Sequence, residues 1–203
     1  MSAEDREKWD SKYSDPDFAP RKPSPVLLSL SDWLPPTRGR ALDLAGGGGR
    51  HSIWLAQLGF QVTLADVSAV GLQVAQHRAA DAGVKLATIE HDLERQGLPE
   101  GPWDLILSIC YLWQPTPDLI RDALSPLGVF VMIQPTTINL TKHEKPPRDF
   151  LLHPGELATR FSDADCERHC LQLCHSSEDW SLDDRHDAVL VVRREDDFAR
   201  STV

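Results

Sequence analysis

The stretch from Arg40 to Ala56 constrains the fold of this chain more than any other. A short apolar run, Ala41–Leu44, leads within one residue to four consecutive glycines, Gly46–Gly49, and a helical pattern of apolar residues resumes at Ile53. Glycine has no Cβ, so its backbone adopts positive φ and lets a ligand lie directly against it. The first N–H groups of the helix that follows then face this ligand. The sequence therefore predicts a strand, a ligand-binding turn and a helix.

The spacing of the glycines bears on which ligand is bound. A dinucleotide-binding turn has the pattern G-x-G-x-x-G. If Gly47 and Gly49 are taken as the first two glycines, Ser52 stands at the third position. If Gly46 and Gly48 are taken instead, His51 stands there. A nicotinamide- or nucleotide-binding oxidoreductase is therefore an alternative that the pattern disfavours.

The length of 203 residues suits a single domain with a sizeable core. Within residues 1–203 we expect an N-terminal helical arm at 1–35, a core at 36–195 and a charged tail at 196–203. No apolar run approaches the roughly 20 residues of a membrane helix, and the charged start lacks the apolar core of a signal peptide. The cytoplasm is the expected location, and no membrane partner is expected.

The charge balance bears on the partners. The formal net charge is −10, which argues against a nucleic-acid partner, because Lys and Arg supply most of the affinity for a phosphate backbone. A small-molecule partner is expected instead, and the sequence leaves open whether the chain is a monomer or a dimer.

Three cysteines raise the question of a metal site. Cys166, Cys170 and Cys174 are evenly spaced, with His169 and His175 beside them. Structural zinc sites usually pair their cysteines in two separate knuckles. The spacing of four equally suits one face of a helix or strand, where free cysteine packs as a small hydrophobic residue. We expect no metal.

The remaining pattern alternates strands and helices, which predicts an α/β fold in three layers. A helix is expected at 4–13 and another from Ser68, its N-cap, to Gly83, with Val70, Val74 and Ala75 facing inward. Further helices are expected at 119–124 and from about residue 154. Strands after the first are expected at 61–66, 84–89, 104–110, 129–133, 171–174 and 188–192, with no helix between the last two.

Asp66 ends the second predicted strand, about 20 residues beyond the glycines. An acid at that distance accepts hydrogen bonds from ribose hydroxyls in nucleotide-binding folds. The alternative is a surface acid at a strand end. We expect Asp66 to bind ribose.

The glycine-rich stretch resembles motif I of the class I S-adenosylmethionine-dependent methyltransferases, D-x-G-x-G-x-G followed by Arg and a helix. Asp43, Gly47 and Gly49 match its acidic position and its last two glycines, while Ala45 replaces the first glycine. The resemblance implies S-adenosylmethionine as cofactor, with S-adenosylhomocysteine as product. It also implies a Rossmann-like αβα sandwich with a seven-stranded, mostly parallel sheet, whose last strand is antiparallel and inserted between strands five and six.

The same resemblance implies a set of cofactor contacts. Trp9 and Tyr13 match a Trp-x-x-x-Tyr element that covers the cofactor in such enzymes, and Asp92 with Leu93 matches the pocket for adenine. The implied cofactor-binding residues are Trp9, Tyr13, Asp43, Ala45, Gly46, Gly47, Gly49, Asp66, Val67, Asp92, Leu93 and Ser108.

Within the family, the chain is most similar to small methyltransferases of the tellurite-resistance and thiopurine type. The Trp9 and Tyr13 arm, the Asp43 to His51 motif and the element Leu152-x-Pro154-Gly155-Glu156-Leu157 carry this similarity. It implies transfer of a methyl group to a small acceptor, including a soft sulfur, selenium or tellurium nucleophile. A protein that binds S-adenosylmethionine without turnover is a second alternative.

Candidates for the acceptor side follow the fourth and fifth predicted strands. Loops at the carboxyl ends of parallel strands carry specificity, although a solvated connector is the alternative for residues 135–148. His143 and Tyr111 are candidate catalytic bases, since a protonated amine or hydroxyl acceptor needs one. Arg148 and Trp113 are candidate substrate-binding residues, Arg148 through a bidentate contact with an anion.

Overall fold

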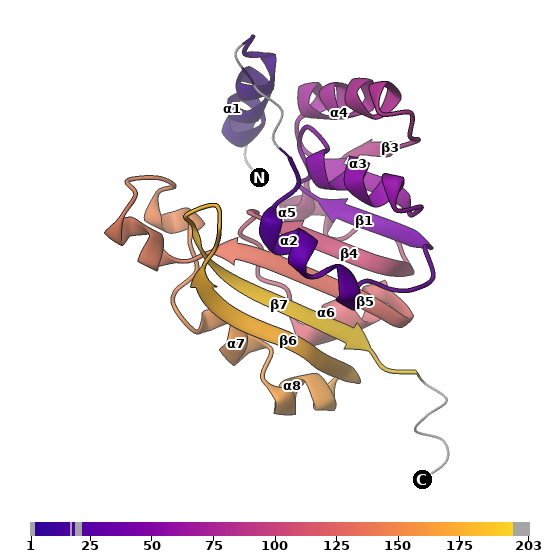
Figure 1. The fold of residues 1–203 in the computed structure, drawn as a ribbon, viewed down its shortest axis with the longest axis vertical. Helices are drawn as coiled ribbons and strands as arrows, with labels where there is room; N and C mark the ends of the chain where they lie inside the picture. The colour runs from indigo at the N-terminus through magenta and orange to yellow at the C-terminus, as the bar shows by residue number, and fades with distance from the viewer. Residues whose placement is uncertain (1–2, 17, 19–21, 197–203) are drawn as a thin grey trace. The chain divides into compact units, whose positions relative to one another are not determined.

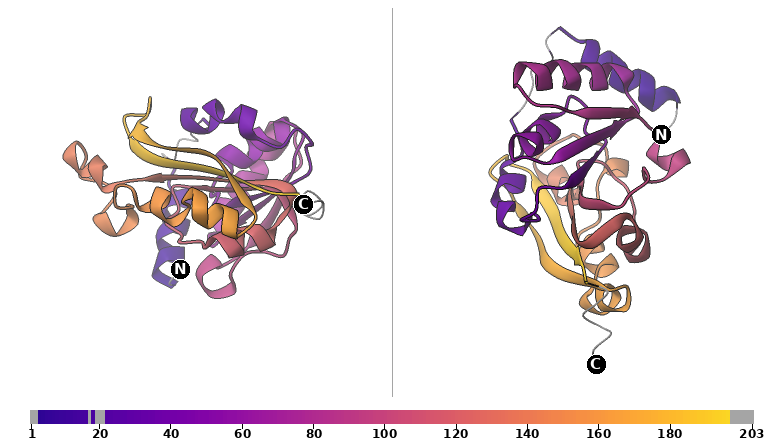
Figure 2. Two further views of the ribbon diagram at one scale, coloured as in Figure 1. Left: turned by 90° about the horizontal axis from the view of Figure 1, so that it is seen from below. Right: turned by 90° about the vertical axis from the view of Figure 1, so that its right-hand side faces the viewer.

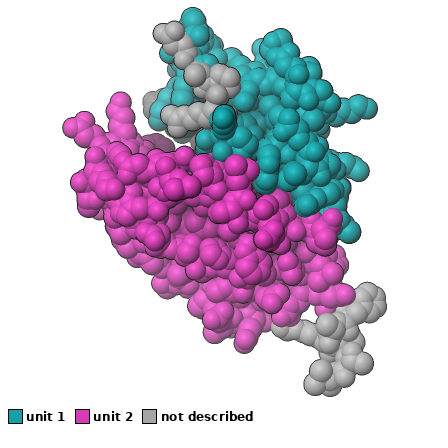
Figure 3. Space-filling view, in the orientation of Figure 1, with its two compact units in different colours: residues 1–23, 37–100 teal, residues 24–36, 101–203 magenta. Residues whose placement is uncertain are grey.

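The computed structural model describes residues 3–16, 18 and 22–196 of the chain (Figure 1). All but the first residue of the charged tail predicted at 196–203 lies outside the described residues. The chain divides into two compact units, one of residues 1–23 and 37–100 and the other of residues 24–36 and 101–203 (Figure 3). The predicted N-terminal arm thus contributes to both units.

The first unit has three parallel strands in the order β3-β2-β1. These are β1 (Arg40–Leu44), β2 (Gln61–Asp66) and β3 (Ala87–Glu90). Arg40 pairs with Gln61, so β1 and β2 run side by side over almost their full length. Leu42 and Leu64 are fully buried. Parallel strands that are covered on both faces require such near-continuous apolar runs.

Four helices belong to this unit: α1 (Ala3–Ser14), α3 (Arg50–Gln57), α4 (Ala69–Asp81) and α5 (Leu93–Gln96). Helix α4 begins as predicted, because the Ser68 hydroxyl accepts a hydrogen bond of 2.9 Å from the Gly71 N–H. Gly83 follows its end with φ +69°.

The inward face of α4 differs from the prediction. Ala75 is buried as expected, but Val70 and Val74 are only half-buried. The fully covered face is formed by Gly71, Leu72, Ala75 and Ala79. Helix α4 also contacts α1, a neighbour that helical periodicity alone does not reveal.

The third strand is shorter than predicted. Alternating residues from Val84 predicted a strand at 84–89, but the ladder with β2 begins where Ala87 pairs with Thr63. Residues 84–86 have no strand assignment. Alternation marks residues that suit a strand, but it does not determine where the neighbouring strand begins to pair.

The second unit has four strands: β4 (Trp103–Ile109), β5 (Leu124–Pro135), β6 (Leu171–Trp180) and β7 (His186–Arg194). Strands β4 and β5 are parallel, whereas β7 is antiparallel to both β5 and β6 and lies between them. The predicted insertion of an antiparallel last strand is confirmed. No helix separates β6 from β7, also as predicted.

Strands β5 and β6 extend further than predicted. Strand β5 includes Ser125, Pro126 and Gly128, and Leu127 has φ +62°. Residues of this kind usually mark turns, so the strand was predicted to begin too late, at Val129. Strand β6 continues through Glu178 and Asp179, which the sequence analysis assigned to an acidic loop.

Short helices flank these strands. They are α2 (Pro25–Ser29), η1 (Ser31–Trp33), α6 (Pro117–Ala123), η2 (Thr137–Thr141), η3 (Arg148–Phe150), α7 (Glu156–Arg160) and α8 (Asp163–Arg168). Helices α7 and α8 contact β7 and β6 and lie together along the same side of this hairpin (Figure 2). None of the helices formed by residues 3–16 and 22–196 is both long and apolar enough to cross a membrane.

Along the chain the strands form a seven-stranded sheet of order β3-β2-β1-β4-β5-β7-β6. The predicted α/β fold with a Rossmann-like, mostly parallel sheet and an antiparallel last strand is therefore confirmed. In parallel sheets of this kind ligands bind beyond the carboxyl ends of the strands.

Candidate functional site

The glycine-rich loop directly follows β1 and leads into α3. Gly47 and Gly49 have φ of +52° and +76°, the left-handed region that favours glycine. A Cβ on Gly46 would lie 2.7 Å from the Asp43 carboxylate, and a Cβ on Gly49 would lie 2.8 Å from the Ala75 Cβ. The loop therefore requires glycine at 47 and 49 for the backbone conformation, and at 46 and 49 because a Cβ would clash.

Ala45 departs from the family pattern, and the backbone there has the conformation of a glycine. Its φ is +52°, and its N–H donates to the Ala65 carbonyl of β2 at 2.8 Å. A left-handed conformation costs a residue with a Cβ about 1–2 kcal/mol. The backbone at this position thus has a conformation that glycine favours, although the residue is alanine.

Asp43 lies beneath the loop, with only 1 % of its surface exposed. Its carboxylate accepts a hydrogen bond of 2.5 Å from the Ser52 hydroxyl. Burial raises the pKa of Asp43 to about 6, the Ser52 hydrogen bond opposes this, and the nearby Asp66 charge adds to it. Ser52, which replaces the third glycine of a dinucleotide turn, therefore helps to fix the acid of this motif.

Asp66 ends β2 beside the same loop. One carboxylate oxygen accepts from the Gly47 N–H and the other from the Ser68 N–H, each at 2.8 Å. Burial raises the pKa of Asp66, the backbone hydrogen bonds oppose this, and the charge of Asp10 adds to it. Asp66, the residue predicted to bind ribose, is thus held rigidly at the glycine loop. Each oxygen of its carboxylate keeps a further lone pair that can accept a hydrogen bond.

The aromatic residues of α1 lie next to this loop. The Tyr13 hydroxyl is so close to Gly47 that a Cβ built there would be 1.8 Å from it. The Trp9 and Tyr13 rings are stacked, with centroids 6.1 Å apart, and Lys12 Nζ lies 4.2 Å from the Trp9 ring centroid. Both aromatic residues that the resemblance assigned to the cofactor are therefore placed in the first unit with the glycine loop.

The remaining predicted cofactor residues of this unit lie at the ends of β2 and β3. Val67 and Leu93 are buried. Asp92 is the N-cap of α5, and its carboxylate accepts hydrogen bonds of 3.1 and 3.4 Å from the Glu94 and Arg95 N–H groups. The predicted adenine-binding acid thus also begins a helix.

Residues on and just after β4 were predicted for two roles, Ser108 for the cofactor and Tyr111 and Trp113 for the acceptor. Ser108 is fully buried on β4, and its hydroxyl has no hydrogen-bond partner among the described residues. Tyr111 is half-buried. Trp113 packs edge-on against the buried Phe130 ring at 6.3 Å and 88°. Trp113 is therefore at least partly a packing residue of the second unit.

The loop that contains His143 is fixed to the β6–β7 hairpin. His143 Nε2 lies 2.7 Å from the Asp184 carbonyl oxygen and 3.4 Å from its carboxylate. Lys142 Nζ lies 3.1 Å from the Asp184 carboxylate and 3.6 Å from the Trp180 ring centroid. Arg148 is exposed at the start of η3. The structure thus joins His143 to a hairpin that sequence reasoning did not connect with it.

A buried network supports the start of this loop. Thr136 Oγ1 lies 2.8 Å from His186 Nδ1, and the Asn139 side chain donates to the His186 carbonyl and accepts from its N–H. All three side chains are buried. No local pattern predicts this network, because Thr136 and His186 are 50 residues apart.

The three evenly spaced cysteines do not share one element. Cys166 is buried in α8, Cys170 follows it with φ +57°, and Cys174 lies on β6. Among the described residues no group of three or more His, Cys, Asp or Glu side chains is arranged to hold a metal ion. The shared face that their spacing predicted does not exist.

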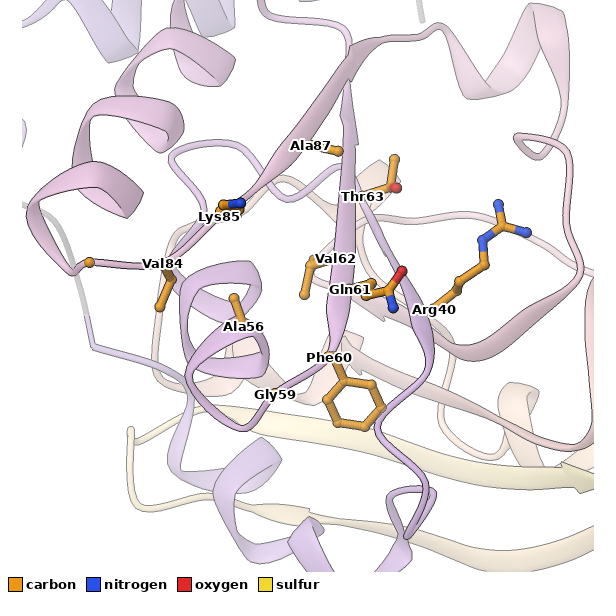
Figure 4. A pocket seen from close by; sticks show the side chains of 11 residues that line it. Arg40, Ala56, Gly59, Phe60, Gln61, Val62, Thr63, Val84, Lys85 and Ala87 are labelled. Carbon is orange, nitrogen blue, oxygen red and sulfur yellow. The ribbon is translucent and has the colours of Figure 1, made fainter.

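A groove of about 510 Å³ opens at the other end of β1 and β2 (Figure 4). It lies between β2 and residues 83–87, where β3 has not yet begun to pair. Phe60 and Val62 form apolar walls, while Lys85, Arg40 and Gln61 contribute polar groups. This groove lies at the strand ends opposite the glycine loop, so cavity size alone does not identify the functional site.

The first unit therefore brings together most of the predicted cofactor residues, from Trp9 to Leu93. Sequence reasoning missed Asp10, which lies one helical turn before Tyr13 and contacts the N-terminus of α4. Asp10 and Tyr13 are three residues apart, so they share one face of the helix, and this spacing could have predicted that Asp10 lies near the site. Of the predicted residues, Ser108, Tyr111, Trp113, His143 and Arg148 belong to the second unit.

Comparison with known proteins relates part of the sequence to a methyltransferase family. Residues 41–127 match the family described as "Methyltransferase domain". An uncharacterised protein of Mycobacterium tuberculosis, Rv1403c, is 40 % identical over 85 residues, which is 41 % of this chain and 30 % of the relative. The chain therefore spans less than a third of the length of this relative.

Solved structures share the fold over most of the chain. TehB of Haemophilus influenzae is 16 % identical, with a TM-score of 0.62 over 94 % of this chain and 67 % of TehB. An S-adenosylmethionine-dependent methyltransferase of Mesorhizobium loti is 22 % identical, with a TM-score of 0.61 over 82 % and 96 % of the two chains. The chain thus shares the fold of S-adenosylmethionine-dependent methyltransferases, and residues 41–127 resemble a methyltransferase domain.

Proposed function

We propose that this chain transfers the methyl group of S-adenosylmethionine to a small-molecule acceptor. The observation that carries the proposal is the carboxylate of Asp66, which the Gly47 and Ser68 N–H groups hold beside the glycine loop. A ribose hydroxyl there donates to the remaining lone pairs of the carboxylate. Gly47 has no Cβ, so a ligand can lie directly against its backbone at the place where the Tyr13 hydroxyl lies in the structure.

Electrostatics at the loop favour this cofactor over a dinucleotide. Asp10, Asp43 and Asp66 are close enough that the charge of Asp66 raises the pKa of Asp43 and the charge of Asp10 raises that of Asp66. This cluster of acids creates a negative potential, which the charge of Arg50 offsets in part, since it lowers the pKa of Asp43. S-adenosylmethionine carries a positively charged sulfonium, whereas the pyrophosphate of a nicotinamide dinucleotide is an anion. The cluster therefore supports the methyltransferase proposal over the oxidoreductase alternative.

The residues of the chain have distinct tasks in this proposal. Bound S-adenosylmethionine would supply a methyl group activated by its sulfonium; the acceptor takes this methyl group in line, and S-adenosylhomocysteine leaves with the electrons of the broken carbon–sulfur bond. Asp66 orients the ribose, the Gly46–Gly49 backbone lies against the cofactor, and Asp92 accepts from the adenine amine. Chemistry of this kind depends mainly on alignment and on exclusion of water.

For the acceptor we propose a soft nucleophile of the sulfur, selenium or tellurium type. TehB, whose structure resembles this chain, is a tellurite-resistance protein, which supports this class. A thiolate or chalcogen oxyanion needs no strong base, whereas an amine or hydroxyl does. Arg148 is the proposed contact for an anionic acceptor, and His143 and Tyr111 are the proposed bases for a protonated one.

Release of S-adenosylhomocysteine with a panel of acceptors tests the proposal. The panel contains a thiol, selenite, tellurite, a primary amine and a phenol, and the control contains no acceptor. We expect product above the control with the thiol or the chalcogen oxyanions. Release with none of the five, by a chain that binds the cofactor, would instead favour a protein that binds S-adenosylmethionine without turnover.

A further inference from the structure

The Tyr13 side chain occupies the face of the glycine loop that the proposed function assigns to the cofactor. Its hydroxyl lies against Gly47 and makes a hydrogen bond with the Gly48 backbone. Its ring lies so close to Gly71 that a Cβ there would be 2.8 Å from it, and the Phe18 ring packs edge-on against it at 5.1 Å. The glycines that leave room for a ligand thus leave room here for a side chain of the same protein.

Asp10 holds this side chain in place from one helical turn away. Its carboxylate accepts a hydrogen bond of 2.5 Å from the Ser68 hydroxyl and one of 3.3 Å from the Val70 N–H. Both donors are at the N-terminus of α4, where an anion is favoured by the unpaired N–H groups. Helix α1 is therefore attached to α4 by a specific polar contact as well as by packing.

The attachment has an electrostatic cost. Burial raises the pKa of Tyr13 to about 12, and the charges of Asp66 and Asp43 act in the same direction. The contact also places the Asp10 carboxylate close enough to Asp66 to raise the pKa of that acid. A cation bound at the loop would compensate these like charges, whereas Tyr13 does not.

We propose that, in the absence of cofactor, helix α1 closes its own cofactor site, with Tyr13 in the place of the ligand and Asp10 holding it there. Binding at Gly47 then requires Tyr13 to leave, so opening of the helix precedes or accompanies binding. This inference rests on the proposed function, because it takes Gly47 as part of the cofactor site. It assigns Asp10 a positioning role that acts through Tyr13.

Association kinetics test the proposal. The full chain is mixed with S-adenosylhomocysteine in a stopped-flow instrument, and the observed rate is followed over increasing ligand concentration. If opening limits binding, the rate reaches a plateau, and Asp10→Ala raises that plateau about tenfold or more, the scale for losing a hydrogen bond to a charged group. Glu7→Ala is the matched control, because Glu7 is an exposed acid on the same helix. It should leave the plateau unchanged.

Tyr13→Ala separates this proposal from a simple lid. If Tyr13 occupies the site, the variant associates faster than the wild type. Unchanged association with faster dissociation would make Tyr13 a cover over bound cofactor and would overturn the proposal. Equal rates in the wild type, Asp10→Ala and Tyr13→Ala, with tight binding in all three, would overturn it while leaving the proposed function intact. If none of the three binds the ligand, the proposed function itself fails, and this inference with it.

A spectroscopic measurement follows Tyr13 directly. The chain has two tyrosines, so the Tyr111→Phe variant labelled with 3-fluorotyrosine gives a single fluorine resonance from Tyr13. We expect this resonance to move toward its position in the unfolded chain when S-adenosylhomocysteine saturates the protein. A resonance that stays in place at saturation would show that Tyr13 does not leave its contact with Gly47.

Discussion

The glycine loop of the first unit and the His143 loop of the second are fixed by different means. At the glycine loop, backbone N–H groups hold Asp66, and the chain turns through residues with positive φ. At the His143 loop, side chains meet a hairpin about 40 residues further along, through contacts of Lys142 and His143 with Asp184. The first arrangement follows from a short local sequence, whereas the second depends on the tertiary fold.

The largest expected effect concerns the buried acid beneath the glycine loop. Because the pKa of Asp43 rises from its ordinary 3.8 to about 6, the folded chain binds a proton below pH 6 that the unfolded chain takes up only near pH 4. Its contribution to stability therefore grows as pH falls through 6. At pH 7 the ionised acid costs up to about 3 kcal/mol, at about 1.4 kcal/mol for each unit of pKa.

Asp43→Asn tests this sign. Between pH 7 and pH 5 the unfolding free energy of the wild type should rise relative to that of the variant by about 1 kcal/mol. Urea titrations of the cofactor-free chain at both values measure it, and the difference between the two proteins cancels the titration of the histidines. A wild type that loses stability relative to Asp43→Asn on acidification would show that the acid is not destabilised by burial.

The second effect concerns cofactor affinity at the same loop. Asp66→Ala should weaken S-adenosylmethionine binding by about 2 kcal/mol or more, because it removes charge-assisted hydrogen bonds. Asp81→Ala, an exposed acid at the end of α4, is the control. The measurement is a calorimetric titration, with circular dichroism to verify the fold. Unchanged affinity in a folded Asp66→Ala chain would remove Asp66 from the site.

The His143 loop gives the contrasting prediction. His143→Ala should lower turnover about tenfold or more with an acceptor that needs a base, and Arg148→Ala should do so with an anionic acceptor. Both variants should leave S-adenosylmethionine affinity near that of the wild type. Lys145→Ala is a control on the same loop. A thiol acceptor should recover at high pH in His143→Ala, because the thiolate then forms without help. Normal turnover in both variants would make residues 135–148 a connector.

The smallest effect tests the backbone at Ala45. Ala45→Gly should stabilise the chain by about 0.5–1 kcal/mol, because φ of +52° is strained for alanine and not for glycine. The same change at Ala80, exposed within α4, should destabilise it by about 1 kcal/mol. Thermal or urea unfolding measures both. If the two substitutions have the same sign, Ala45 is not strained.

The comparison explains which parts of the molecule the sequence predicts. Strand β1, the glycines and Asp66 can be predicted from the sequence, because each follows from local chain geometry or from a fixed distance along the chain. The start of β3 was predicted three residues early, because pairing with Thr63 depends on a neighbouring strand. The contact of Asp10 with Ser68 joins residues 58 positions apart, and that of His143 with Asp184 joins residues 41 apart. No local pattern encodes such pairs.

The central claim is that the glycine loop with Asp66 binds S-adenosylmethionine. Its most direct test is a calorimetric titration of the full chain with S-adenosylhomocysteine and, separately, with NADH under the same conditions. We predict saturable binding of S-adenosylhomocysteine at one site per chain and no binding of NADH. Binding of NADH without S-adenosylhomocysteine would contradict the account and favour an oxidoreductase.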